Sequence, residues 1–183
     1  MFKNIFIACL AIIVFSFSPS NFCEYSSKGL SNSNGLNIKI YAPCDWATSN
    51  KETQFDVINL KYSGLKELAT AALIIADLGL NEKEGSALIS TNGIKKLTKD
   101  RGNFVYSKLF NLKGIKGGQI IKNTVMPVEN GTFYFYTVSN YFWYKNKIVN
   151  IQYTVGGRNN EFKKRYNSYI ELFEIMLKKT EFN

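Results

Sequence analysis

Apolar and polar residues alternate along several stretches of the chain, which is the pattern of strands with one buried face. The first such stretch is residues 37–41, where Ile38 and Ile40 stand between more polar neighbours. Pro43 follows closely, and because proline has no backbone donor, the strand is expected to end there at a sheet edge. Trp46 is then placed to fold back over the sheet and cap the core.

Five later stretches share this strand-like pattern. They are residues 53–62, 103–112, 118–128, 132–143 and 147–155. The last two are rich in Tyr, Phe, Val and Ile, which favour a pleated sheet, and the turn at Lys145-Asn146 would join them as a hairpin. Residues 114–117 are expected to form a loop, and Gly156-Gly157 is expected to end the last strand.

Two segments have the three- and four-residue spacing of amphipathic helices. The first follows Asn81, a good N-cap with acidic residues in the next turn, and its apolar stripe continues to Leu97 although Gly85 and Gly93 weaken it. The second runs from about residue 159 or 160 to residue 178 and should lie across the sheet. Its apolar stripe contains Phe162, Tyr166, Tyr169, Phe173 and Met176.

Residues 65–80 fit two structures. Leu65, Leu68, Ala72 and Ile75 lie at helical spacing, and alanine and leucine are good helix formers. Residues 71–77 also read as a fully buried strand that ends near Gly79. Local propensity alone favours the helix.

Residues 1–20 have the pattern of a secretory signal, with a basic residue, an apolar run from Ile5 to Phe17 and small residues up to Ser20. We expect cleavage near Ser20 and an exported protein, periplasmic or extracellular; an uncleaved membrane anchor is the alternative. The apolar run is shorter than the roughly 20 residues that a membrane-spanning helix needs. Residues 21–35 then predict a flexible lead-in, and residues 36–183 a single domain.

The formal charge of the chain is +9, and the positive residues are spread along it. Such a charge attracts acidic partners, which include acidic proteins, anionic lipid and wall polymers. A merely solvated surface is the simpler explanation. Nucleic acid is not expected as a partner, because no nucleic-acid-binding motif accompanies the charge.

Two cysteines remain once Cys9 leaves with the signal. Cys23 and Cys44 would both lie in an oxidising compartment, where a disulfide between them is expected. The alternative is two free thiols, with Cys44 as a small core residue.

The order of these elements, with the motif APCDW at residues 42–46 and the aromatic hairpin FYFYTVSNYFWYKNKIVNIQYTV at residues 133–155, resembles the PsbP/Mog-type α+β family. The resemblance covers roughly residues 35–182. It implies an antiparallel sheet of about six or seven strands with two main helices packed on it. It also implies that residues 71–77 form a strand. It supplies no binding residues that match positions of this chain.

The chain contains no histidine. Ser-His-Asp and Cys-His nucleophile systems and histidine-ligated metal sites are therefore excluded, and no cofactor or metal is expected. Paired carboxylates could still hydrolyse glycosides, and Asp45 beside Trp46 is the most suggestive acid. An Asp after Pro is more often a turn residue, so a non-enzymatic role is expected.

The expected function is that of an exported binding or accessory protein that acts through a protein–protein contact. Its interaction surface is placed at the tip of the aromatic hairpin, at Trp143, Tyr144, Lys145 and Lys147, because exposed Tyr and Trp favour interfaces. Helices or loops that cover both faces of the hairpin would remove this surface. An immunity-like protein is a narrower form of the same idea. A carbohydrate-active or lipid-associated protein is the alternative from another class.

Overall fold

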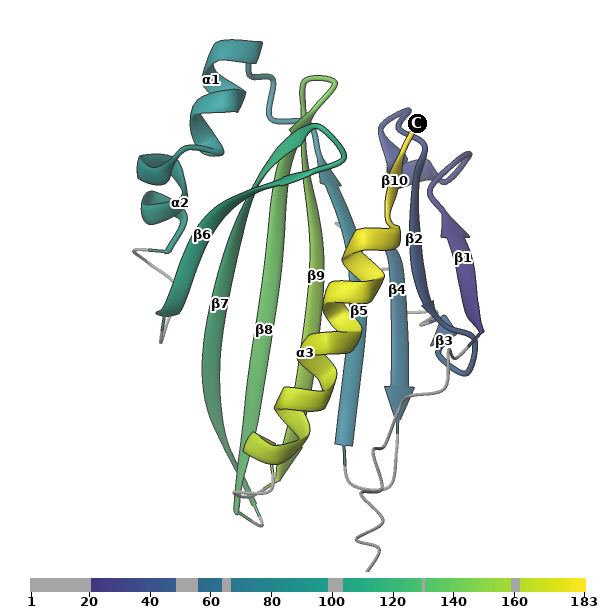
Figure 1. Cartoon of the computed structure of the whole chain (residues 1–183), viewed down its shortest axis with the longest axis vertical. Helices are drawn as coiled ribbons and strands as arrows, with labels where there is room; N and C mark the ends of the chain where they lie inside the picture. Colours follow the sequence, from purple (N-terminus) through teal and green to yellow (C-terminus); the bar gives the residue numbers. More distant parts are fainter. Residues whose placement is uncertain (1–20, 49–55, 64–66, 99–103, 130, 159–161) are drawn as a thin grey trace, which may run out of the picture.

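The computed structural model describes residues 21–48, 56–63, 67–98, 104–129, 131–158 and 162–183 (Figure 1). These residues form two antiparallel sheets and three α-helices. The large sheet has the order β3 (Ala47–Thr48), β4 (Asp56–Ser63), β5 (Glu67–Ala76), β9 (Lys147–Arg158), β8 (Gly131–Tyr144), β7 (Ile115–Val128) and β6 (Phe104–Leu112). The small sheet has the order β1 (Phe22–Ser26), β2 (Ile38–Pro43) and β10 (Glu181–Phe182). This arrangement confirms the expected α+β fold.

Helix α3 (Phe162–Lys179) lies across one face of the large sheet, as its apolar stripe predicts (Figure 1). Strand β2 packs beside it, so the main core lies between the two sheets and α3. Ile38 and Ile40 from β2 and Met176 from α3 are almost completely buried there. Trp46 is only 5% exposed and stacks on Tyr62, which confirms its role as a cap on the core.

Two short helices, α1 (Glu82–Leu88) and α2 (Thr91–Thr98), contact the large sheet through β8, β7 and β6. Asn81 caps α1 as expected: its side chain accepts a hydrogen bond from the Glu84 N–H, and Glu84 returns one to the Asn81 N–H. The sequence predicts a single helix here, and this prediction is wrong, because α1 and α2 are separate helices. Ser90 interrupts it, because its hydroxyl accepts from the Gly93 N–H and starts the second helix.

Residues 71–76 belong to β5, so the strand implied by the family resemblance is confirmed over the helix favoured by local propensity. Ten residues of β5 pair with β9 on one side, and β4 pairs on the other. A strand buried between two neighbours is stabilised by pairing and packing, and this tertiary context overrides the helical preference of alanine and leucine.

Three loop expectations are wrong. Part of the lead-in, residues 22–26, forms β1 and pairs with β2. The loop at residues 114–117 is a two-residue turn at Lys113-Gly114, where both residues have positive φ, so β7 already begins at Ile115. Gly156 and Gly157 continue β9 and do not end it. Glycine fits at residue 156 because the ring of Phe133 occupies the space where a Cβ would project.

The remaining expected elements lie close to the observed ones. Lys145-Asn146 forms the predicted hairpin turn, with φ values of 49° and 59°. Helix α3 ends at Lys179, one residue beyond the expected end. The signal segment 1–20, and residues 53–55, 65–66, 103 and 159–161 of the expected elements, lie outside the described residues.

Candidate functional site

Cys23 and Cys44 form a disulfide, as the sequence predicts. Cys23 lies in β1 opposite Ala42, and Cys44 follows the end of β2. Their Cα atoms are 4.9 Å apart. The Cys44 N–H also donates to the Asn21 carbonyl oxygen. The disulfide and this hydrogen bond together tie the start of the described chain to the corner at Pro43.

Trp143 is not an exposed contact residue, and the expectation from the sequence is wrong at this position. Its side chain is 8% exposed, and its indole N–H donates to the Glu82 carboxylate at 2.8 Å. The ring lies against Gly85 of α1, where a Cβ would collide with it. Trp143 therefore holds α1 on the sheet, which is a structural role.

The other three residues of the hairpin tip also make internal contacts. Tyr144 is half-buried and packs edge-on against Phe182, with ring centroids 5.1 Å apart. Lys145 is exposed; its ammonium lies 5.2 Å from the centre of the Tyr144 ring and donates to the Asn183 backbone oxygen. Lys147 donates to the Asp77 carboxylate at 2.7 Å. Tyr144 and Lys145 leave some surface to solvent, but the expected exposed aromatic pair does not form.

The ion pair between Lys147 and Asp77 predicts an acid-dependent loss of stability. The Lys147 ammonium, and then the Gly79 N–H, lower the pKa of the Asp77 carboxyl below its ordinary value. The ionised carboxylate therefore favours the folded state above the unfolded pKa, and this contribution is lost as the pH falls through the lower folded pKa. We expect Asp77→Asn to reduce the free energy of unfolding at about pH 6 but not at about pH 2. Denaturant titrations of wild type and Asp77→Asn between about pH 2 and about pH 6 test this prediction. A difference in the free energy of unfolding that is the same at every pH would contradict it.

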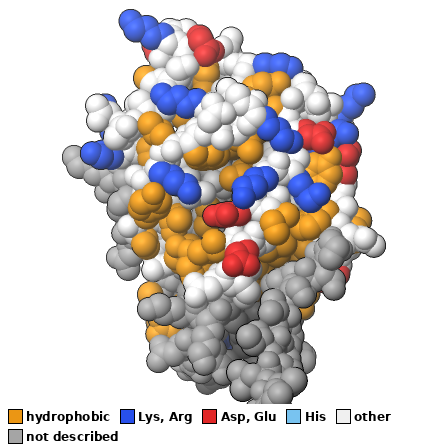
Figure 2. Space-filling model, in the orientation of Figure 1, with side chains coloured by type: hydrophobic (Ala, Val, Ile, Leu, Met, Phe, Trp, Pro, Cys, Tyr) orange, Lys and Arg blue, Asp and Glu red, His pale blue; other side chains and the backbone are white. Residues whose placement is uncertain are grey.

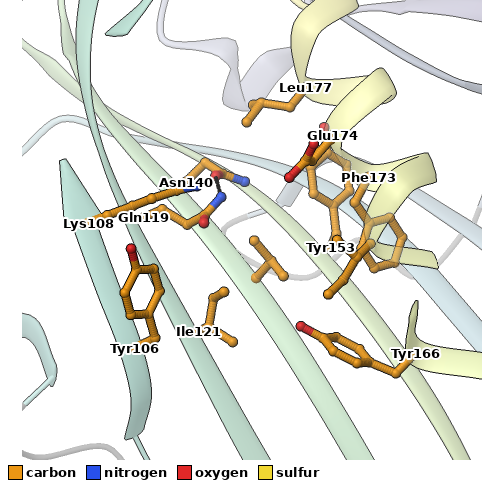
Figure 3. A pocket seen from close by; sticks show the side chains of 12 residues that line it. Tyr106, Lys108, Gln119, Ile121, Asn140, Tyr153, Tyr166, Phe173, Glu174 and Leu177 are labelled. Atoms are coloured by element: carbon orange, nitrogen blue, oxygen red, sulfur yellow. Dashed lines mark hydrogen bonds between the residues drawn. The ribbon is translucent and has the colours of Figure 1, made fainter. Parts of the chain in front are cut away.

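A cavity of about 200 Å³ lies between the sheet and α3 (Figure 3). No sequence pattern singles it out, because its lining comes from five elements far apart in the chain. Exposed or half-buried side chains form its mouth and buried ones its floor. Its lining residues are Tyr106, Lys108, Gln119, Ile121, Val138, Asn140, Tyr153, Tyr166, Ile170, Phe173, Glu174 and Leu177.

The floor of the cavity carries a fixed pair of amides. The Gln119 side-chain N–H donates to the Asn140 side-chain oxygen at 2.8 Å, as drawn in Figure 3. Asn140 in turn donates to the Ile151 carbonyl oxygen at 3.0 Å, and both amides are buried. Because Asn140 is held by two hydrogen bonds, the Gln119 amide has a defined position.

Aromatic rings form the α3 side of the cavity. Tyr153 of β9 stacks on Phe173 of α3, with ring centroids 5.0 Å apart and planes only 11° from parallel. The Tyr153 hydroxyl is completely buried beside the Thr180 hydroxyl. Burial raises the pKa of Tyr153 and, on α3, the pKa of Tyr166. Both phenols therefore stay neutral at physiological pH.

The face that carries α3 presents apolar side chains interspersed with lysine, arginine and a few acidic side chains (Figure 2). Four of the large apolar residues that are exposed lie on the neighbouring strands β6 and β7, within a few residues of the start of β6. Val105 and Tyr106 on β6 are 48% and 49% exposed, and Val125 and Met126 on β7 are 50% and 46% exposed. We call these four residues the open edge.

In the described ranges, the β7 backbone at the open edge is also unpaired on one side. Strand β6 pairs with β7 only as far as Phe104, which lies opposite Lys122. Strand β7 continues to Val128, paired with β8 but with no second strand among the described residues, as Figure 1 shows below the end of β6. Unpaired strand edges bind other extended segments readily.

Within the described ranges, no group of three or more acidic, cysteine or histidine residues is placed to hold a metal ion. None of the helices in those ranges has the length and hydropathy that crossing a bilayer requires.

No family model and no curated protein matches the chain. Two solved structures match most of it. LpqN, a Mycobacterium tuberculosis protein involved in cell envelope biogenesis, aligns with a TM-score of 0.54 at 11% identity over 89% of this chain and 92% of its own. CyanoP, the cyanobacterial PsbP of Synechocystis, aligns with a TM-score of 0.53 at 10% identity over 92% of this chain and 96% of its own. The chain therefore has the PsbP-like α+β fold that its sequence resembles.

Proposed function

We propose that this chain is an exported accessory protein of the cell envelope that acts without catalysis, by binding an acidic segment of another protein at the open edge. Export is supported by the signal-like residues 1–20 and by the Cys23–Cys44 disulfide, which suits an oxidising compartment. The fold shared with LpqN, whose role lies in the cell envelope, supports the same location.

The observation that carries the proposal is the combination of exposed apolar side chains and an unpaired strand at the open edge. Isolated exposed apolar residues are common, as Leu30, Leu78 and Ile175 illustrate on other elements. Four of them beside a free strand edge give a partner both backbone hydrogen bonds and apolar contact. This is the recognition mode of an added β-strand.

Charge defines the kind of partner. Residues 104–128, which span β6 and β7, contain Lys108, Lys113, Lys116 and Lys122 and no acidic residue. These lysines give the strand pair a positive charge, which speeds association with an acidic segment. Lys122 lies nearest the open edge, opposite Phe104, and Lys113 and Lys116 lie at the turn end of the pair.

The proposal predicts that an acidic side chain at the open edge abolishes partner binding. Val125→Asp/Met126→Asp should weaken binding at least about tenfold, because it removes apolar contact and repels an acidic segment. Ile175→Asp is the matched control, since Ile175 is 44% exposed on α3 and lies outside the open edge. Pull-downs with chains that begin at residue 21, from the exported fraction of the native cells, would compare the three proteins.

A partner retained by wild type and Ile175→Asp but lost by the double variant supports the proposal. A partner retained by all three contradicts it. Binding to anionic lipid vesicles in place of protein would also contradict it, and such binding should weaken steeply between about 0.05 and about 0.5 M salt.

A further inference from the structure

The side of the large sheet that faces away from α3 carries three threonines in a row. Thr70 of β5 lies opposite Thr154 of β9, which lies opposite Thr137 of β8. The residues directly before and after each of the three belong to the core beneath α3. Because side chains alternate along a strand, these threonines point to the other side of the sheet. We call Thr70, Thr154 and Thr137 the threonine row.

The threonine row is open to solvent, since each of its side chains is only half-buried. Helix α1 covers this side of the sheet at Trp143, and α2 covers it at Gly118. Both positions lie nearer than the row to the Lys145-Asn146 turn, and Figure 1 shows the two helices together at one corner of the sheet. Along β8, Trp143 is six residues from Thr137 (143 minus 137), which is about 20 Å in a strand.

The hydroxyls of the row can form further hydrogen bonds. Those of Thr137 and Thr154 lie 3.1 Å apart and share one hydrogen bond. A hydroxyl donates one hydrogen bond and accepts two, so one donor and several acceptor positions of this pair stay available. The Thr70 hydroxyl makes no side-chain hydrogen bond within the described ranges. Sugar hydroxyls offer the same mixture of donors and acceptors, so they are suitable partners for the row.

We propose that this side of the sheet binds an acidic polysaccharide. Sugar hydroxyls bind the threonine row, anionic groups of the polymer bind Lys61 and Arg158, and a sugar ring packs on Phe133 and Phe135. This site is separate from partner binding at the open edge and does not depend on it.

Two exposed cations lie beside the row. Lys61 of β4 lies opposite Thr70 and points away from α3, because its neighbour Leu60 is in the core. Arg158 lies on β9, four residues beyond Thr154 (158 minus 154). Neither cation forms an ion pair with another described residue. Strand geometry places them about 10 Å apart across the sheet and about 13 Å apart along it, a separation that a chain of linked sugars can span.

The charge beside the row favours an anionic polymer. On β4 the acidic residue on this side of the sheet is Asp56, which accepts a hydrogen bond from Asn59 at 3.1 Å. Asn59 lies between Asp56 and Lys61 in the strand, so the carboxylate does not neutralise the lysine. Hydrogen bonds between a cation and a carboxylate are stronger than those between neutral groups. A polysaccharide with carboxylates is therefore expected to bind more tightly than a neutral one.

Two aromatic rings lie between Thr154 and Arg158. Gly156 of β9 has no side chain, and the rings of Phe133 and Phe135 from β8 occupy the space where its Cβ would project. The ring centroids are 4.8 Å apart, and both side chains are half-buried, so part of each ring faces solvent. The C–H groups of a sugar pack well on the electron-rich face of an aromatic ring.

A polysaccharide fits this surface better than a protein does. Among the described residues, none of the large apolar residues that are exposed lies on β4, β5, β8 or β9, whereas the centre of a protein interface is apolar. Strands β5, β9 and β8 are each paired on both sides, so an added strand would find no free backbone groups there. Hydroxyls, two cations and two ring faces are what this surface offers a ligand.

Calorimetric titrations of the chain from residue 21 test the proposal at about 0.15 M salt, where attraction between exposed charges is screened. The acidic probes are short fragments of polygalacturonate and of alginate. Their methyl esters keep the hydroxyls and lose the charges, whereas polyglutamate keeps the charges and has no hydroxyls. We expect an acidic polysaccharide to bind best, and its methyl ester and polyglutamate to bind about tenfold more weakly, since each loses one kind of hydrogen bond.

Three results would overturn the proposal. The first is that neither acidic polysaccharide binds at millimolar concentration. The second is that polyglutamate binds as tightly as they do, because charge alone would then explain the attraction. The third is that the methyl esters bind as tightly as the acids, because the cations would then have no part in binding.

The threonine row is tested by Thr137→Val/Thr154→Val, which removes two hydroxyls and keeps branched side chains that favour a strand. The variant should bind the acidic polysaccharide about tenfold more weakly and polyglutamate as before. Thr132→Val is the matched control, because Thr132 is half-buried on the α3 side of the same strand. An unchanged affinity of the double variant for the acidic polysaccharide would overturn the proposal.

The cations are tested by Lys61→Met, which should weaken the acidic polysaccharide about tenfold and leave its methyl ester unchanged. Lys108→Met is the matched control, because Lys108 is exposed on the α3 side of the sheet. Equal effects of the two variants would count against the site. Amide chemical shifts of the wild-type chain locate the polymer without any variant: the largest changes are expected in the threonine row, and largest changes at another surface would overturn the proposal.

Discussion

Trp143→Ala is expected to lower the free energy of unfolding by about 3–5 kcal/mol, the usual effect of removing a large aromatic side chain from a core. The side chain is 8% exposed, fills the space above Gly85 and donates to Glu82. Its removal would leave α1 without its main contact with β8, so the helix is expected to detach before the sheet unfolds.

Two further variants separate the contribution of the hydrogen bond from that of the packing of the ring. Glu82→Gln keeps an acceptor for the indole N–H and should change the stability by less than about 1 kcal/mol, because Glu82 is exposed. Trp143→Phe keeps most of the packing and should fall between wild type and the alanine variant. Chemical denaturation, with amide hydrogen exchange in α1, measures all three. A Trp143→Ala protein as stable as wild type that has lost its partner would show instead that the hairpin tip is the interface.

Removing the Cys23–Cys44 disulfide is expected to lower the free energy of unfolding by about 3 kcal/mol. In the loop-entropy description this is the effect of opening a loop of about 20 residues, and here the bonded cysteines are 21 positions apart. Strand β1 should be affected most, because it pairs only with β2 and has no neighbour on its other side among the described strands.

The paired variant Cys23→Ser/Cys44→Ser would be compared with wild type in denaturant, with and without a reductant. Reduced wild type and the double variant should lose the same stability, and the reductant should not affect the variant. Equal stability of oxidised wild type and variant would show that the β1–β2 pairing does not need the bond.

Much of the architecture could be predicted from the sequence, because most strands have one face in the core and therefore alternate. The Ile38 and Ile40 pattern predicts β2, and the spacing of Phe173 and Met176 predicts the buried face of α3. Strand β5 needed the family resemblance, since its neighbours on both sides bury it and its composition alone favours a helix.

Trp143 was misplaced because alternation says which residues share a face but not what covers that face. Phe142 points towards the core beneath α3, which leaves Trp143 on the opposite side of the sheet. That side carries α1 at this point. The short helix brings Gly85 against the indole through a contact between residues that are 58 positions apart (143 minus 85), and no local pattern records such a contact.

The cavity and the open edge could not be predicted for a related reason. The cavity needs β6, β7, β8, β9 and α3 in their final positions. Among the described residues, β6 pairs with β7 only as far as Lys122 while β7 continues, and strand lengths depend on neighbours as well as on composition.

The small sheet implies an order of events during folding. Its strand β2 pairs with β1 close by in sequence, but also with β10, where Glu181 lies opposite Lys39 at a separation of 142 residues (181 minus 39). Contacts that span so much of a chain form late, because closing a long loop is entropically unfavourable. Until β10 arrives, Ile38 and Lys39 of β2 are expected to stay unpaired on that side and open to association with other chains. Refolding yield should therefore fall with protein concentration more steeply than that of a chain whose sheets close locally.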